Sequence, residues 1–189
     1  RDYSKIEKFC MFIGYPRSGH SLVAALLDAH PEIVMGMEWG VLQHMNAGYG
    51  RRQIFYSLTR NARLFRTREG NTWTGYSYRL EGQWQGKYDN IRIIGDKMGG
   101  RTSLLLADNP EMADRLTTTV GLPVKWIHVI RNPFDTITTM TLRMMEKRKG
   151  LSLNGTSGQL AFFIDSYFKR VGAVSEFIDA GKLDLLHVY

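Results

Sequence analysis

The chain has 189 residues, 43% of them hydrophobic and 23% charged, and its 25 lysines and arginines against 18 aspartates and glutamates give a net charge of +7. This usage is typical of one globular domain, and no apolar run approaches the roughly 18 residues that a membrane-spanning helix needs. The single cysteine, Cys10, excludes an intrachain disulfide and favours a reducing compartment. We therefore expect a soluble, cytoplasmic protein, with a lumenal fragment of a membrane-anchored protein as the alternative.

Runs of apolar residues with a strand-like pattern alternate along the chain with runs at helical spacing. Strands are expected at residues 9–14, 33–35, 91–95, 124–130 and 183–188. Helical stretches are expected at residues 19–29, 39–68, 101–119, 133–148 and 157–180. This alternation predicts an α/β fold in three layers, a central parallel sheet with helices on both faces. In such sheets, ligands bind beyond the carboxyl ends of the strands.

We expect one domain over residues 1–189. Because the sequence does not begin with methionine and ends at Tyr189, directly after a strand-like run, we expect its C-terminal part to be missing. Between residues 70 and 90 the alternation breaks into a segment rich in glycine and aromatic residues, which is typical of an inserted hairpin or lid. Its rings, from Trp73 to Trp84, would pack on the sheet edge or form an aromatic wall for a substrate.

Six arginines lie between Arg51 and Arg68, interleaved with apolar residues at near-helical spacing. This pattern favours the solvated face of an amphipathic helix. The alternative is a site for an acidic partner. Together with the net positive charge, that alternative keeps a non-catalytic binder of anions or nucleic acid among the hypotheses.

The first strand is followed by the segment Gly-Tyr-Pro-Arg-Ser-Gly-His-Ser, residues 14–21, whose two glycines have the spacing of a phosphate-binding P-loop. A strand before it and a helix after it give the context that this motif needs. Four backbone amides would point into the concavity: those of Ser18, Gly19, His20 and Ser21. A nucleoside triphosphatase has a lysine where this chain has His20, and here Arg17 supplies the permanent charge. The alternative for the His20 side chain is a hydrogen bond to nearby backbone.

A second motif, Arg-Asn-Pro-Phe-Asp-Thr-Ile-Thr-Thr, begins at Arg131, where the strand at 124–130 ends. Its proline and Asp135 suit the first turn of a helix. Arg131 leaves the strand where a ligand crevice is expected, so Arg131 and Thr139 could flank one phosphate. The alternative is that Arg131 only pairs with Asp135.

Together these two motifs resemble those of the sulfotransferases that use 3′-phosphoadenosine 5′-phosphosulfate (PAPS). That family has a 5′-phosphosulfate loop, usually Pro-Lys/Arg-Ser-Gly-Thr-Thr, and a 3′-phosphate motif, Arg-Asn-Pro-x-Asp-x-x-x-Ser/Thr. The resemblance implies that Arg17 and the amides from Ser18 to Ser21 hold the phosphosulfate. It also implies that Arg131 and Thr139 hold the 3′-phosphate.

A finer resemblance, to tyrosyl-protein sulfotransferases and related bacterial enzymes, lies in Leu-Leu-Asp-Ala-His-Pro-Glu-Ile-Val-Met-Gly-Met-Glu, which ends at Glu38. In that branch a glutamate after the glycine is the proposed general base, and the resemblance nominates Glu38. The spacing departs from the pattern because Met37 intervenes. The alternative is a surface glutamate at a helix start.

Asp96 and Lys97 follow the predicted strand at 91–95 and would face the same crevice. Lys97 could neutralise charge on the oxygen between phosphate and sulfuryl group, and related sulfotransferases place a lysine similarly. Asp96 could instead hold Mg²⁺, which a P-loop kinase with a degenerate loop would require.

We therefore expect a PAPS-dependent sulfotransferase that acts on a hydroxyl or amine acceptor and releases adenosine 3′,5′-bisphosphate (PAP). Its expected catalytic residues are Arg17, Glu38 and Lys97. We expect no metal requirement, no nucleic-acid partner and no membrane span. The Mg²⁺-dependent kinase is the alternative, and the acceptor and oligomeric state stay open.

Overall fold

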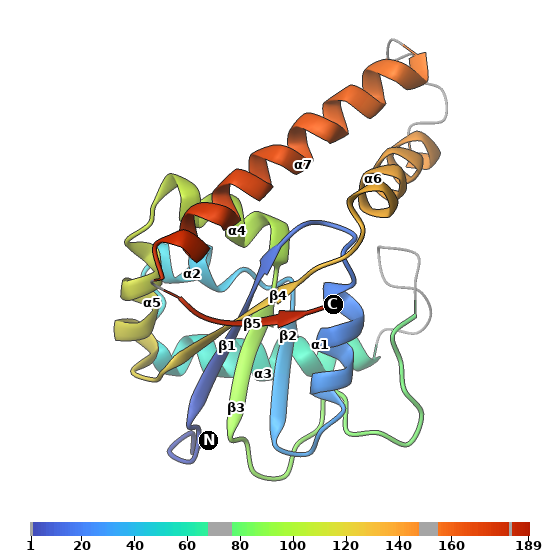
Figure 1. Cartoon of the computed structure of the whole chain (residues 1–189). Coiled ribbons are helices and arrows are strands. Elements are labelled where there is room, and N and C mark those ends of the chain that lie inside the picture. Colours follow the sequence, from blue (N-terminus) through green and yellow to red (C-terminus); the bar gives the residue numbers. More distant parts are fainter. Residues whose placement is uncertain (1, 68–76, 148–154, 182) are drawn as a thin grey trace.

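The computed structural model describes residues 2–67, 77–147, 155–181 and 183–189. Five parallel strands form its central sheet in the spatial order β2-β3-β1-β4-β5. The strands are β1 (Lys8–Gly14), β2 (Ile33–Met37), β3 (Ile93–Lys97), β4 (Val124–Val129) and β5 (Asp184–Val188). Because all five run the same way, their carboxyl ends lie at one edge, the upper edge in Figure 1. The predicted α/β fold with a parallel sheet is confirmed.

Seven helices are described. They are α1 (His20–Asp28), α2 (Val41–Asn46), α3 (Arg51–Thr67), α4 (Gly99–Asp108), α5 (Met112–Val120), α6 (Pro133–Lys147) and α7 (Gly155–Asp179). Helix α1 covers one face of the sheet, where Ala24 and Ala25 pack with Phe12. Helices α3 and α5 cover the other face, where Phe55 and Leu116 join the larger core. Alternate side chains of β1 enter the two cores, so helices cover both faces as predicted.

The 39–68 stretch contains two helices, α2 and α3, and the single helix expected at 101–119 is divided into α4 and α5. Gly48 ends the first half of the 39–68 stretch with a positive φ of 91°. In the 101–119 stretch, Pro110 separates α4 from α5, because proline has no N–H to continue the helix. Strand β3 begins and ends two residues later than expected, so Asp96 and Lys97 are strand residues that pair with β2.

Residues 77–90 form turns and bends with no helix or strand, and residues 70–76 of the predicted hairpin or lid lie outside the described part of the chain. Cys10 is a free, buried thiol of β1, and burial raises its pKa to about 11. No helix among the described residues has the length and apolar character that crossing a bilayer requires.

Candidate active site

The predicted site residues lie in order along the carboxyl edge of the sheet. Glu38 follows β2, Lys97 ends β3, Arg17 lies in the loop after β1 and Arg131 follows β4. Since β2, β3, β1 and β4 are consecutive neighbours in the sheet, these four positions form a row. Neighbouring strands are about 4.8 Å apart, so the row is about 14 Å long.

A cleft of about 600 Å³ runs along this row. Its lining includes these predicted site residues: Arg17, Gly19, His20, Ser21, Glu38, Lys97, Arg131 and Thr139. Ser18 is buried beneath the loop, and its Oγ lies 3.1 Å from Nε2 of His20. The structure therefore brings together residues from four strand ends that are far apart in sequence.

Of the four amides predicted to bind an anion, that of Ser18 donates to the carbonyl oxygen of Tyr15 at 3.4 Å, whereas those of Gly19, His20 and Ser21 have no backbone partner among the described residues. Arg17 adopts a left-handed conformation with a φ of 67°, and Gly19, at the N-cap of α1, has a φ of 107°. No side chain of the described residues caps this helix, and its first turn has no acidic residue. Because the first amides of a helix lack partners within the helix and lie at its positive end, this turn is suited to an external anion.

The side chain of His20 is buried at the floor of the loop. Its Nε2 lies 3.2 Å from the carbonyl oxygen of Ile13, and its ring fills the space beside Gly99, where a Cβ would lie 2.3 Å from His20 Cε1. Burial lowers the pKa of His20 to about 3, and the nearby Lys97 adds to this shift. The imidazole is therefore neutral at pH 7 and shapes the loop, and only the amide of His20 is available to a ligand.

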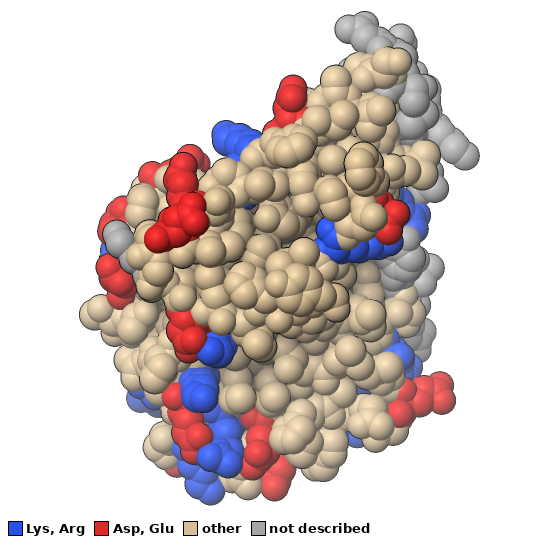
Figure 2. Space-filling model, in the orientation of Figure 1, with Lys and Arg blue, Asp and Glu red and all other residues tan. Residues whose placement is uncertain are grey.

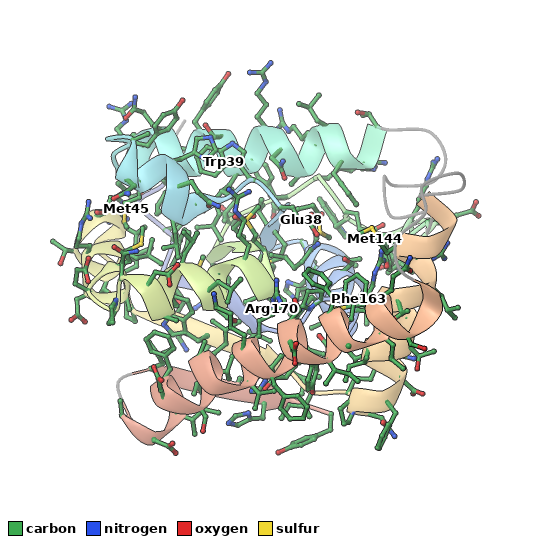
Figure 3. The ribbon with its side chains drawn as sticks, turned by 90° about the horizontal axis from the view of Figure 1, so that it is seen from above. Glu38, Trp39, Met45, Met144, Phe163 and Arg170 are labelled. Carbon is green, nitrogen blue, oxygen red and sulfur yellow. The ribbon has the colours of Figure 1, made fainter. Side chains whose placement is uncertain are left out.

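Glu38 and Lys97 form a direct ion pair. Lys97 Nζ lies 2.6 Å from Glu38 Oε1, and the side chains are 6% and 28% exposed, respectively. Glu38 is the second non-glycine residue with a positive φ, at 55°. Backbone strain of this kind is typical of functional sites, and here it occurs at two of the three residues predicted to be catalytic. Seen from above, Glu38 lies between α3 and α7, with Phe163 and Arg170 on the α7 side (Figure 3).

Asp96 is fully buried and holds the turn that carries Glu38. Its Oδ1 accepts a hydrogen bond from the amide of Trp39 at 3.1 Å, and its Oδ2 accepts from Gly40 and Val41 at 2.8 and 3.0 Å. Burial raises the pKa of Asp96, and these three hydrogen bonds oppose that shift. Both oxygens are occupied by the N-terminus of α2, so Asp96 is not placed as the Mg²⁺ ligand that the kinase alternative requires.

Arg131 lies against the loop after β1. Its Nη1 is 3.4 Å from the carbonyl oxygen of Arg17, and its Nη2 is 3.6 Å from Oδ2 of Asp135. Arg131 therefore contacts Asp135 and also lines the cleft, so the two alternatives for Arg131 do not exclude each other. Thr139 donates its hydroxyl to the carbonyl oxygen of Asp135 at 2.7 Å, and it lines the cleft one helical turn further on.

Two further polar side chains line the cleft, those of Arg101 and Tyr78, and neither belongs to the two anion-binding motifs. Arg101, in the first turn of α4, lines the cleft, and with the amide of Gln43 oriented to satisfy its neighbours, Gln43 Oε1 accepts from Arg101 Nε at 2.8 Å. Tyr78 lines the cleft from the 77–90 segment. The pair of glycines at 99 and 100 could have indicated a helix start at the cleft, and Tyr78 belongs to the aromatic segment for which the sequence left an aromatic wall as one of two alternatives.

Asp28 anchors the segment that contains Tyr78. This buried carboxylate at the end of α1 accepts hydrogen bonds from the amides of Met35 and Gly86, both at 2.8 Å. Burial raises the pKa of Asp28 to about 7, although both hydrogen bonds act in the opposite direction. The 77–90 segment is thereby joined to α1 and β2 at the side of the cleft.

No protein-family model and no curated protein matches the sequence. Among solved structures, the chain is similar to mouse sulfotransferase SULT7A1 complexed with PAP, at 15% identity and a TM-score of 0.43 over 98% of this chain and 53% of that one. It is also similar to the sulfotransferase domain of the Synechococcus PCC 7002 olefin synthase, at 14% identity and a TM-score of 0.49 over 100% of this chain and 68% of that one. The chain thus spans about half the length of the mouse enzyme. Both of these solved structures are sulfotransferases.

Proposed function

We propose that this chain transfers a sulfuryl group from PAPS to a hydroxyl or amine acceptor. The observation that carries the proposal is the order of side chains in the cleft. A carboxylate lies at the β2 end, a lysine follows at β3, an open helix N-terminus with an arginine lies at β1, and a second arginine lies at β4. This order suits a donor with two anionic groups, bound over β1 and β4, and an acceptor that enters from the β2 side.

The residues at the β1 and β4 ends fit such a donor. The amides of the first turn of α1 and the Arg17 guanidinium would hold its phosphosulfate. Arg131 and Thr139 would hold the 3′-phosphate, and the contact between Arg131 and the backbone of Arg17 keeps the two sites adjacent. PAPS supplies an activated sulfuryl group, and its transfer leaves negative charge on a phosphate oxygen.

The residues at the β2 and β3 ends suit proton removal and charge stabilisation. Glu38 would accept the proton of the acceptor hydroxyl, and its ion pair with Lys97 fixes the position of its carboxylate beside the cleft. Lys97 lies between this base and the loop that carries Arg17, so Lys97 and Arg17 would stabilise the negative charge on the donor side. The buried Asp96 keeps Glu38 in place through the turn that follows it.

Nucleotide-dependent stabilisation tests the donor assignment without any acceptor. PAP without metal is expected to stabilise the protein by about 2.7 kcal/mol at a hundredfold excess over its Kd. Arg131→Ala should abolish most of this effect, whereas Arg52→Ala, which removes the same charge from an exposed position on α3, should leave it unchanged. Stabilisation only by ATP with Mg²⁺ would favour the kinase instead.

Transfer itself is tested with labelled PAPS and a panel of acceptors that covers tyrosine peptides, sugars, lipids and small alcohols. The proposal predicts labelled sulfate on at least one class and its loss in Glu38→Gln. Absence of both PAP binding and transfer would overturn it.

A further inference from the structure

The positive surplus of the chain is concentrated on one helix. Helix α3 carries five arginines and no aspartate or glutamate in its 17 residues. The rest of the chain has 20 basic and 18 acidic residues, which nearly cancel. On the face shown in Figure 2, which is opposite α3, basic and acidic side chains lie side by side toward the lower end. The surplus is therefore a local property of α3.

Three of the five arginines, Arg52, Arg60 and Arg63, lie exposed on the outer side of α3, whereas Arg51 and Arg66 are half-buried. Its inner side, with Ile54, Phe55 and Leu58, is buried in the core. Four residues at spacings of four, four and three lie along one outer line, the arginine ridge: Arg52, Tyr56, Arg60 and Arg63. All four are exposed. At 1.5 Å per residue the ridge is about 16 Å long. Figure 3 shows α3 at the outer edge of the molecule, with side chains directed away from the sheet.

Charge on the ridge is not neutralised locally. None of the five α3 arginines forms an ion pair with another described residue. Arg63 donates to the hydroxyl of Tyr88 at 3.3 Å and lies 5.3 Å from the centre of its ring. This contact joins the 77–90 segment to the helix, and the exposed Lys87 and Asp89 on either side of Tyr88 offset each other in charge.

Large hydrophobic groups are exposed among these charges. Tyr56, within the ridge, is 53% exposed, and Leu64, one residue after Arg63, is 49% exposed. Arginine, tyrosine and leucine together on a convex helix surface suit the interface of an anionic bilayer, which takes cations at the phosphates and apolar groups below them. A nucleic-acid strand would gain little from Leu64, and it is better bound by a groove with several stacked rings.

We propose that the outer face of α3 is a docking surface for anionic lipid membranes. The protein lies on the membrane through the arginine ridge, with Tyr56 and Leu64 reaching into the headgroup region. The cleft lies at the carboxyl edge of the sheet, whereas α3 covers one face of the sheet, so a membrane at the outer side of α3 leaves the cleft accessible to solutes. This inference does not depend on the proposed sulfuryl transfer, since it concerns another face of the protein.

Sedimentation with large unilamellar vesicles tests this inference. The expected result is binding to vesicles with 30 mol% phosphatidylserine, little binding to pure phosphatidylcholine, and weaker binding in 300 mM than in 50 mM salt, because exposed charges are screened. Arg52→Ala/Arg60→Ala should lower the partition coefficient by about 30-fold. The matched control Lys8→Ala/Lys169→Ala removes the same charge from exposed positions elsewhere and should change it by less than about threefold.

Leu64→Ser distinguishes a membrane from a dissolved polyanion. It leaves the charge unchanged and should lower vesicle binding by several-fold, while binding to a single-stranded RNA 20-mer should not change. Equal loss in the ridge and control variants, no preference for anionic vesicles, or tighter binding of the RNA than of the vesicles would each overturn the inference. All of the substituted side chains are exposed, and thermal unfolding of each variant verifies the fold.

Discussion

The turns after β1 and β2 have the same backbone pattern but differ in what the first amides of the following helix bind. In each turn, a non-glycine residue with a positive φ follows the strand, and a glycine with a positive φ precedes the helix. These residues are Arg17 and Gly19 in the turn after β1, and Glu38 and Gly40 in the turn after β2. At α2 the amides are taken by the protein's own carboxylate, Asp96. At α1, none of the side chains that the structure describes caps the helix.

This difference shows how one local architecture can serve two purposes. An internal anion makes the β2 turn a rigid support for Glu38, whereas the open β1 turn is left for an external anion. The row of residues in the cleft thus has a fixed carboxylate at the β2 end and a turn suited to an external anion at the β1 end.

Removal of the Arg17 guanidinium should have the largest effect. In the proposed reaction, Arg17→Ala should lower kcat by about 10² to 10³, the range for removal of one charge-stabilising donor. The free energy of unfolding should hardly change, because the side chain belongs to the open turn. Near-normal turnover at saturating donor would exclude Arg17 from the mechanism.

Asp96→Asn should destabilise the turn after β2, whose amides bind the Asp96 carboxylate. Its amide NH₂ would face one of the backbone N–H groups that the carboxylate now satisfies, so the free energy of unfolding should fall by about 3 kcal/mol. Urea unfolding measures this loss, and the exposed Asp165→Asn serves as the control, with an effect within about 0.5 kcal/mol. A loss as small as that of the control would mean that the turn does not depend on Asp96.

His20 should make the open turn sensitive to acid. Its pKa is about 3 in the folded protein and near 6.5 when unfolded, so below pH 6.5 the unfolded chain takes up a proton that the folded protein does not. The stability that depends on neutral His20 is thus complete above pH 6.5 and declines as the pH falls, by about 2 kcal/mol between pH 7 and pH 5.

His20→Gln should remove that part of the pH dependence. Asp28, with its raised pKa, acts in the opposite direction in both proteins, so the difference between wild type and variant isolates His20. Urea unfolding at pH 5, 6 and 7 gives this difference, with the exposed His30→Gln as the control. Identical pH profiles for wild type and His20→Gln would contradict the buried, neutral histidine.

The smallest expected effect is the difference in stability between Arg17→Gly and Arg17→Ala, which measures backbone strain because both variants lack the charge. Glycine tolerates a φ of 67° and alanine does not, so Arg17→Gly should be more stable than Arg17→Ala by about 1 kcal/mol, with equal loss of activity. The difference in thermal midpoint checks this, and equal midpoints would mean that the left-handed turn stores no strain.

Most of the framework could be predicted from local patterns. The alternation of strands and helices, the glycine spacing before α1 and the proline that opens α6 are local in sequence, and each is found where expected. The boundaries of β3 and the positions at which the helical stretches divide were less predictable, because single glycine and proline residues and strand pairing decide them.

The sequence by itself determined which chemical groups this protein can bring to an anionic ligand: the amides of a glycine turn, Arg17, Arg131, a lysine and a glutamate. Only the tertiary structure decided how they are used. Lys97 and Glu38 are 59 positions apart and meet because β3 pairs with β2. Asp96 caps α2, and His20 is buried against Gly99, through the same long-range packing. Local propensity acts over a few residues, so it cannot specify contacts that exist only once the sheet has formed.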